Sequence, residues 1–357
     1  MLRRHDLGIL ASVFENLQSF SDEKGNLHCS IRDILGGELS VPRLEDYREQ
    51  LSVAEVPVYG GWTTCIWLET GDGHDLVFDV GSGFRGCARR LQHKWADREE
   101  RHLYIFGSHS HLDHTNGFDQ AAVCFDPRNH LHIHGNRQFL WALDSSLGIF
   151  SGSILESMRG IHTPISYQIM PSKFEGIEIY DPDEERSEPV KNGRPLGTPI
   201  QIGKTRLIPF PVYHPAPCLA YRVEHGDKVF VLCTDHELRI GDPGPGQTES
   251  EAAEARVIAH SQGVDLLYRD GQFLRDEYLA KTGIDGAAPV SRRDWGHSCI
   301  EDVVEMARNC GVKQTLIGHH DPNRRWQEHR EIDEKLQAES TPECAIALAR
   351  SEVVIDL

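Results

Sequence analysis

The sequence has no apolar run of the roughly 18 residues that a membrane-spanning helix needs. At the N-terminus two arginines precede a short apolar stretch, but Glu15, Asn16 and Gln18 interrupt that stretch. A cleavage site built from small residues is also missing, so we expect no signal peptide. These absences argue against a membrane partner.

Paired cysteines of the CxxC type are missing too. The nine cysteines are odd in number and scattered along the chain, which is typical of reduced thiols in a cytoplasmic protein. We therefore expect a cytoplasmic location and no zinc site made of cysteines. If the chain binds a metal, histidines and carboxylates must supply the ligands.

Positive charge is scarce: 37 lysines and arginines stand against 55 aspartates and glutamates, so the formal net charge is −18. This balance disfavours binding to nucleic acid or to anionic membranes. It does not exclude a small anionic substrate, because a bound metal ion inverts the local field. At 357 residues and 39% hydrophobic content, the chain can bury a large core in one or two domains.

Histidine is abundant, with 20 residues, and its spacing is more informative than its number. The segment SHSHLDHTNGF at 108–118 follows a short apolar strand expected over 102–107. It places His109, His111, Asp113 and His114 within six residues, which requires a tight loop at the end of the strand. Imidazole and carboxylate together suit zinc, manganese or iron.

Three further polar residues stand where apolar strands end. His214 follows the strand expected over 205–213, Asp235 follows 228–234, and His319 follows 313–318. Packing can explain one such residue, but three in succession downstream of the HxHxDH motif indicate one metal site.

This series of motifs resembles the metallo-β-lactamase fold hydrolases over about residues 56–322. The resemblance implies an α/β fold, a four-layer αββα sandwich with metals at one edge between its two sheets. It also implies two divalent metal ions, zinc in the first place and manganese or iron as alternatives. The implied first-metal ligands are His109, His111 and His214, and the implied second-metal ligands are Asp113, His114 and His319, with Asp235 bridging both. We choose His319 rather than His320 because the last ligand of the family directly follows its strand.

Within that family the chain is most similar to ribonuclease Z and related phosphodiesterases. The bridging residue is an aspartate in the context CTDHE, and the segment WGHSCIEDVVEMA resembles the histidine motif of that branch. The segment DLLYRDGQF resembles a strand that ends in an acidic residue, Asp270. The resemblance implies that His297, oriented by Asp270, protonates the leaving group, and that Asp113 accepts or orients a proton of the nucleophile.

The implied reaction is hydrolysis of a small phosphodiester or cyclic phosphate by a hydroxide held between two metal ions. Transfer RNA or another nucleic acid is a disfavoured substrate, because the chain is acidic and no basic, glycine- and proline-rich arm is found. Two alternatives stay open: a lactone, thioester or β-lactam hydrolase, and a mono-iron oxidoreductase of the persulfide dioxygenase type. We also expect a homo-oligomer, a dimer.

The domain organisation follows from changes in residue composition along the chain. Residues 1–50, with helical pieces near 8–19 and 43–52, are expected to form an N-terminal extension or cap. Residues 51–357 form the metallo-hydrolase domain, in which 151–200 is expected to be an insertion that shapes the rim of the active site. Two smaller expectations concern side chains: Asp79 supports a ligand histidine, and the alternating His130, His132 and His134 form a solvent-facing row without a role.

Overall fold

The computed structural model describes residues 58–150, 170–186, 189–241, 243–351 and 353–357, with short pieces between 13 and 47. The chain divides into two compact units, Met1–Gly61 with Arg350–Val354, and Trp62–Ala349 with Ile355–Leu357. In the first unit, α2 (Ile31–Ile34) begins after Ser30, whose side chain caps it. The helices predicted near 8–19 and 43–52 lie mostly outside the described residues.

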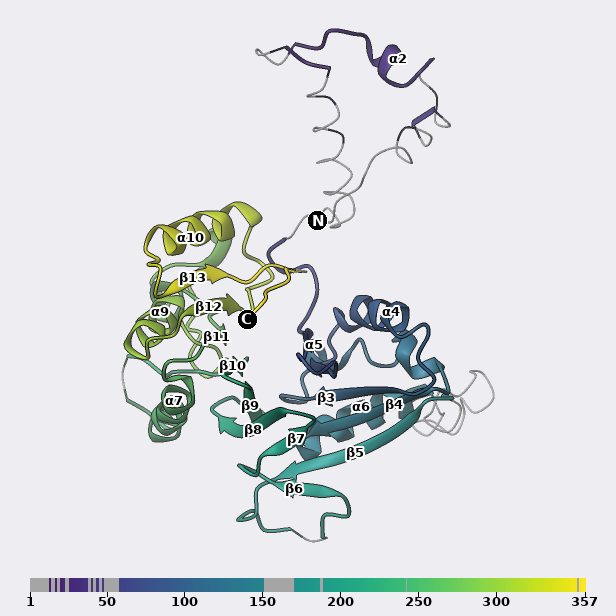
Figure 1. Ribbon diagram of the computed structural model, residues 1–357. Helices are drawn as coiled ribbons and strands as arrows, with labels where there is room; N and C mark the ends of the chain where they lie inside the picture. The colour runs from purple at the N-terminus through teal and green to yellow at the C-terminus, as the bar shows by residue number, and fades with distance from the viewer. Residues whose placement is uncertain are drawn as a thin grey trace, which may run out of the picture. The chain divides into compact units, whose positions relative to one another are not determined.

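The second unit is built on two sheets (Figure 1). In the part of this unit that the structure describes, a six-stranded sheet has the order β1-β2-β3-β4-β5-β6, and a seven-stranded sheet has the order β13-β12-β11-β10-β9-β8-β7. The first contains β1 (Ile66–Glu69), β2 (Asp75–Phe78), β3 (Arg101–Phe106), β4 (Asn129–Gly135), β5 (Lys173–Tyr180) and β6 (Gly193–Pro195). The second contains β7 (Ile200–Ile202), β8 (Thr205–Val212), β9 (Cys218–His225), β10 (Lys228–Cys233), β11 (Leu266–Asp270), β12 (Gln314–Gly318) and β13 (Ala345–Leu348).

Helices cover the outer face of each sheet. The first sheet packs against α4 (Phe84–Lys94) and α6 (Arg137–Phe150), and the second against α7 (Gln247–Ser261), α9 (Ile300–Asn309) and α10 (Trp326–Ala338). The shorter helices are α5 (Leu112–Thr115), η1 (Ala122–Phe125), α8 (Arg275–Tyr278) and η3 (Ile284–Gly286).

Strand β2 shows how the layers pack. It is buried on both faces, and three of its four residues are apolar. Leu76 and Phe78 point into the apolar cluster between the two sheets, whereas Val77 points into the cluster between the first sheet and its helices. A third cluster lies between the second sheet and α7 and α9. The predicted αββα sandwich is therefore confirmed.

The predicted insertion over 151–200 needs a correction. Residues 151–169 lie outside the described part, but β5 pairs in parallel with β4, β6 pairs with β5, and β7 pairs with β8. The C-terminal part of the segment thus belongs to the two sheets. Its strands were not predicted because they lie near sheet edges, where β5 exposes or half-exposes most of its side chains and carries no clear apolar pattern.

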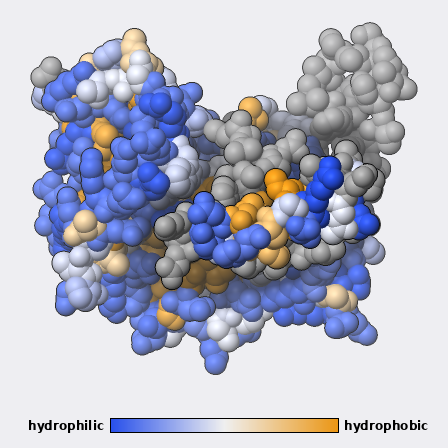
Figure 2. Space-filling model, turned by 90° about the horizontal axis from the view of Figure 1, so that it is seen from above, coloured by the Kyte–Doolittle hydropathy of each residue, from blue (hydrophilic) through white to orange (hydrophobic). Residues whose placement is uncertain are grey.

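The surface matches the composition. Hydrophilic residues dominate the described part of the face shown in Figure 2, and hydrophobic residues gather in smaller areas between them. Among the described residues, no helix combines the length and the apolar character needed to cross a bilayer.

Candidate metal centre

The candidate ligands converge because the strands that precede them end at one edge of the sandwich. Asp79 follows β2, residues 109–114 follow β3, Asp235 follows β10, and His319 follows β12. Parallel strands bring their carboxyl ends together, and this is the edge at which α/β proteins build sites.

The backbone turns sharply at three of these strand ends. Asp79, Asp235 and His319 have φ angles of 57°, 29° and 56°, in the left-handed region that aspartate and histidine tolerate better than most residues. Backbone strain of this kind persists where surrounding structure holds it, commonly at functional sites.

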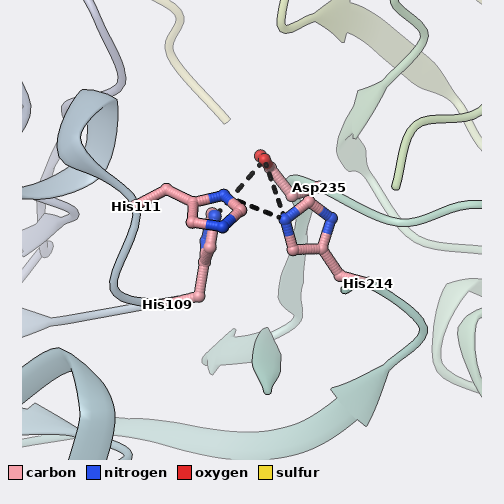
Figure 3. Close-up of side chains that lie close together, drawn as sticks. All are labelled: His109, His111, His214 and Asp235. Carbon is pink, nitrogen blue, oxygen red and sulfur yellow. Dashed lines mark hydrogen bonds and ion pairs between the residues drawn. The ribbon is translucent and has the colours of Figure 1, made fainter. Parts of the chain in front are cut away.

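Four residues form the first ligand group: His109, His111, His214 and Asp235 (Figure 3). Their candidate ligand atoms all lie within 4.8 Å of one another. His214 Nε2 is 3.2 Å from His111 Nδ1, and His109 Nε2 is 3.5 Å from Asp235 Oδ2. Two nitrogens on one tetrahedral zinc ion lie about 3.3 Å apart at the usual Zn–N bond length, so this spacing suits a shared ion.

Three residues form the second ligand group: Asp113, His114 and His319. Asp113 Oδ2 is 3.4 Å from His114 Nε2 and 3.2 Å from His319 Nε2. Asp235 turns its other oxygen toward this group, with Oδ1 3.3 Å from both imidazole Nε2 atoms. One carboxylate therefore faces both ligand groups, as a bridging ligand must.

Hydrogen bonds to one ring nitrogen of His114 and of His214 determine which nitrogen of each ring is left to bind a metal ion. His114 donates its Nδ1–H to Asp79 Oδ2 at 2.8 Å, and His214 donates its Nδ1–H to the carbonyl oxygen of Gly296 at 2.9 Å. Both rings therefore direct an Nε2 lone pair at the centre. Ser108 holds Asp79 in turn, through its backbone N–H and its hydroxyl, each 2.7 Å from a carboxylate oxygen.

The protonation states of the first ligand group suit metal binding, whereas in the metal-free chain the Asp235 carboxylate overcomes burial and raises the pKa of His114 and, to about 9, that of His319. Burial lowers the pKa of His109 to about 2 and that of His214 to about 4, so both imidazoles are neutral at neutral pH. Burial alone would raise the pKa of Asp113, but the nearby His114 and His319 imidazoles hold it well below its usual range. Neutral imidazoles and an ionised carboxylate are the forms that coordinate a cation.

Two buried nitrogens need a partner that a metal ion would provide. In the described part of the chain, Nε2 of His109 and Nε2 of His114 are buried without a hydrogen-bond partner. A buried polar atom without a partner costs about 1–3 kcal/mol. The two Nε2 atoms face the carboxylates of the ligand groups, so the residues present fit divalent ions.

His297 and Asp270 lie beside the second ligand group. His297 donates its Nδ1–H to Asp270 Oδ2 at 3.0 Å, and its ring stacks on that of His319 with 4.5 Å between centroids. Asp235, His297 and His319 also bring candidate ligand atoms within 4.8 Å of one another. His297 lies in the loop that precedes α9, which begins at Ile300.

The adjacent histidines lie elsewhere. His320 directs its Nε2 to the carbonyl oxygen of Ala349 at 2.7 Å and packs against His329. His236 directs its Nε2 to Glu254, which also forms an ion pair with Arg269. The structure thus brings His319, and not His320, into the second ligand group.

Sequence reasoning assigned no role to Glu237, although it stands two residues after Asp235. Its side chain is fully buried, and Oε1 accepts hydrogen bonds from the Tyr278 hydroxyl and from the backbone N–H of Asp294. Oε2 accepts from the backbone N–H of Gly296, whose carbonyl oxygen holds His214. Glu237 therefore positions the 294–297 loop; the only sequence signal was an acidic residue after a ligand.

Replacing Asp79 with asparagine tests the support of His114. Asparagine keeps the size and tolerates the left-handed backbone, but it replaces a charged acceptor with a neutral amide. We expect the affinity for the metal ion held by the second ligand group to fall about 10–100-fold. Competition with a chromophoric chelator measures this. An unchanged affinity would show that Asp79 does not support the site.

Replacing Glu237 with glutamine tests the loop support. The amide NH₂ of glutamine would face a backbone N–H, so one of the three donors loses its acceptor. We expect the free energy of unfolding to fall by about 1–3 kcal/mol, with a loss of turnover because Gly296 and His297 move. Chemical denaturation and steady-state kinetics check both effects; a variant as stable and as active as the wild type would refute the role.

Comparisons with known proteins agree with this arrangement. The family model described as beta-lactamase superfamily domain matches residues 74–320. Ribonuclease BN of Cronobacter sakazakii (strain ATCC BAA-894) is 24% identical over 219 residues, which cover 53% of this chain and 68% of that protein.

Two solved structures show the same fold. The short form of human tRNase Z aligns with a TM-score of 0.52 and 14% identity over 84% of this chain and 94% of that one. A diphosphatase from the PhnP family aligns with a TM-score of 0.50 and 17% identity over 83% of this chain and 84% of that one. Because the family model spans more than half of the sequence and includes both ligand groups, the chain belongs to the beta-lactamase superfamily, as a hydrolase with the metallo-β-lactamase fold.

Proposed function

We propose that this hydrolase is a phosphodiesterase that cleaves a small phosphodiester or a cyclic phosphate. The observation that carries the proposal is the His297–Asp270 pair beside the second ligand group. A carboxylate-held imidazole next to a metal centre can protonate a leaving oxygen. Opening a lactone needs such an acid less, because the leaving oxygen stays attached to the product.

We propose that the two ligand groups hold two divalent ions, with Asp235 shared between them. Zinc is our first choice, with manganese and iron as alternatives, because imidazole and carboxylate sets accept all three. When bound, a pair of such ions acts as a Lewis acid on a phosphoryl group and lowers the pKa of water.

The chain itself contributes proton transfer and orientation. The Asp113 side chain is 40% exposed, whereas that of Asp235 is 2% exposed, so Asp113 is the carboxylate that substrate and solvent can reach. It is positioned to accept a proton from the attacking water. His297 carries a proton on Nε2 for the leaving oxygen, while Asp270 holds its Nδ1–H and stabilises the charged ring.

The proposal of a small substrate rests on charge. The chain has a net charge of −18, which opposes the approach of a long polyanion. Ribonuclease BN, the relative matched above, carries a name that implies RNA cleavage, but charge leads us to prefer a smaller phosphodiester for this chain. The nine cysteines are unpaired, which supports our further proposal of a reducing, cytoplasmic location.

A panel of substrates tests the proposal on the metal-loaded chain. It contains bis(p-nitrophenyl) phosphate, a cyclic nucleotide, a lactone, a precursor tRNA and a persulfide monitored for oxygen uptake. We expect kcat/KM for a small phosphodiester to exceed that for the lactone by about 100-fold or more, with no oxygen uptake. A higher kcat/KM for the lactone or for tRNA, or oxygen uptake with the persulfide, would contradict the proposal.

A further inference from the structure

A second histidine cluster lies at the other end of β3, remote from the metal centre. His102 of β3 and His130 of β4 are direct register partners, and His132 follows two residues along β4, so all three project from one face of the sheet. One ring nitrogen of each lies within 4.8 Å of the others. His102 precedes His109 by seven residues, which corresponds to about 20 Å of extended chain.

The predicted solvent-facing row is wrong for these residues. His134 is buried and stacks on Phe106, while His130 and His132 are half-buried. Instead of forming a row along β4, His130 and His132 combine with His102 across the strands. The ring centroids of His130 and His132 lie 4.0 Å apart, and that of His102 lies 5.4 and 5.3 Å from them.

Glu175 orients His132 as carboxylates orient metal-binding histidines. Its Oε2 is 2.9 Å from His132 Nδ1, and because a carboxylate only accepts, His132 must donate that N–H. The hydrogen bond from His132 holds the pKa of Glu175 below its usual range, so the carboxylate stays charged. His132 then presents an Nε2 lone pair to His102 Nδ1, 3.0 Å away.

The spacing and the charge state suit a cation. The 3.0 Å separation needs to widen by only a few tenths of an ångström to reach the about 3.3 Å of two nitrogens on one tetrahedral zinc ion. In the first ligand group the corresponding separation is 3.2 Å. Burial, followed by the neighbouring His132, lowers the pKa values of His102 and His130, so both rings are neutral at neutral pH. Lys173 opposes a cation here, whereas Glu175 and Glu100 favour one.

We propose that His102, His130 and His132 bind one transition-metal ion of the kind that prefers imidazole, zinc or copper, at a site separate from the hydrolytic centre. Three imidazoles leave a coordination position for water. The ion would tie β3 to β4 at the beginning of both strands. Since binding to the folded state alone stabilises a protein by mass action, the site would couple stability to zinc concentration.

The test measures zinc per chain in the full-length protein at buffered free zinc, by atomic emission after equilibrium dialysis. The double variant His102→Asn/His130→Asn should bind one ion fewer than the wild type. Added zinc should also raise its melting temperature by less than it raises that of the wild type. Its hydrolysis of bis(p-nitrophenyl) phosphate should be unchanged. His93→Asn is the matched control, because His93 is exposed on α4 outside the cluster; it should bind as many ions as the wild type.

Equal zinc content in the wild type and the double variant would overturn the proposal, and would leave these rings as a hydrogen-bonded histidine cluster only. Glu175→Gln gives a second test that leaves all three imidazoles in place. It should weaken the affinity for the extra ion about 10–100-fold and recover the full stoichiometry at higher free zinc. An unchanged affinity in Glu175→Gln would count against the site even if the double variant failed to fold.

Discussion

Replacing Asp235 with asparagine is expected to abolish most of the metal-dependent hydrolysis, lowering kcat/KM by about a thousandfold or more, equivalent to about 4 kcal/mol. Oδ1 of Asp235 faces His114 and His319, and Oδ2 faces His109 and His214. An amide offers one oxygen and no charge, so it cannot serve both ligand groups. Asparagine tolerates the φ of 29°, which keeps the substitution from acting through the backbone.

Metal content and kinetics on the same preparation check this prediction. Asp227→Asn is the control, because Asp227 is exposed beside the opposite end of β10 and should leave both measurements unchanged. We expect Asp235→Asn to retain less than two ions at the centre. A variant that kept both ions and wild-type turnover would show that Asp235 is not a shared ligand.

Replacing His297 with alanine is expected to slow hydrolysis in proportion to the basicity of the leaving group. For a diester with an alkoxide leaving group, loss of the general acid should lower kcat about 10²–10⁴-fold. For a diester that releases p-nitrophenolate, which leaves readily without a proton, the loss should be less than about tenfold. Asp270→Asn should show the same pattern more weakly, because it removes only the partner that holds Nδ1–H.

The leaving-group dependence separates proton donation from other roles. If His297 mainly holds metal, as its position near Asp235 and His319 would allow, both substrates should lose rate equally and metal content should fall. If it only packs against the ring of His319, neither substrate should respond strongly. Steady-state rates on the two substrates, with metal content measured beside them, distinguish these outcomes.

The sequence allowed the metal ligands to be predicted because these histidines and aspartates stand where apolar strands end. The ligand residues stand directly after apolar strands, so their convergence follows from parallel strands that end at one edge. The αββα layering was implied by the resemblance to the metallo-β-lactamase fold hydrolases, and the apolar residues of α9 at helical spacing agree with it.

The rest depended on contacts between residues far apart in the chain. Glu237 acquires its role only through Asp294 and Gly296, 57 and 59 residues away, which no local pattern records. The histidine cluster combines residues of β3 and β4 with a carboxylate of β5, and β5 itself was hidden by its polar sequence. Strand register decides such neighbours, and register is not visible in one strand alone.

The most direct test of the two-metal account is a titration of the metal-free protein with zinc or manganese, followed by turnover of bis(p-nitrophenyl) phosphate. The titration uses the His102→Asn/His130→Asn variant, so that the second histidine cluster binds none of the added metal. The account predicts that turnover starts near zero and rises to a plateau at two ions per chain. Turnover that does not depend on added metal, or a plateau reached with one ion, would contradict it.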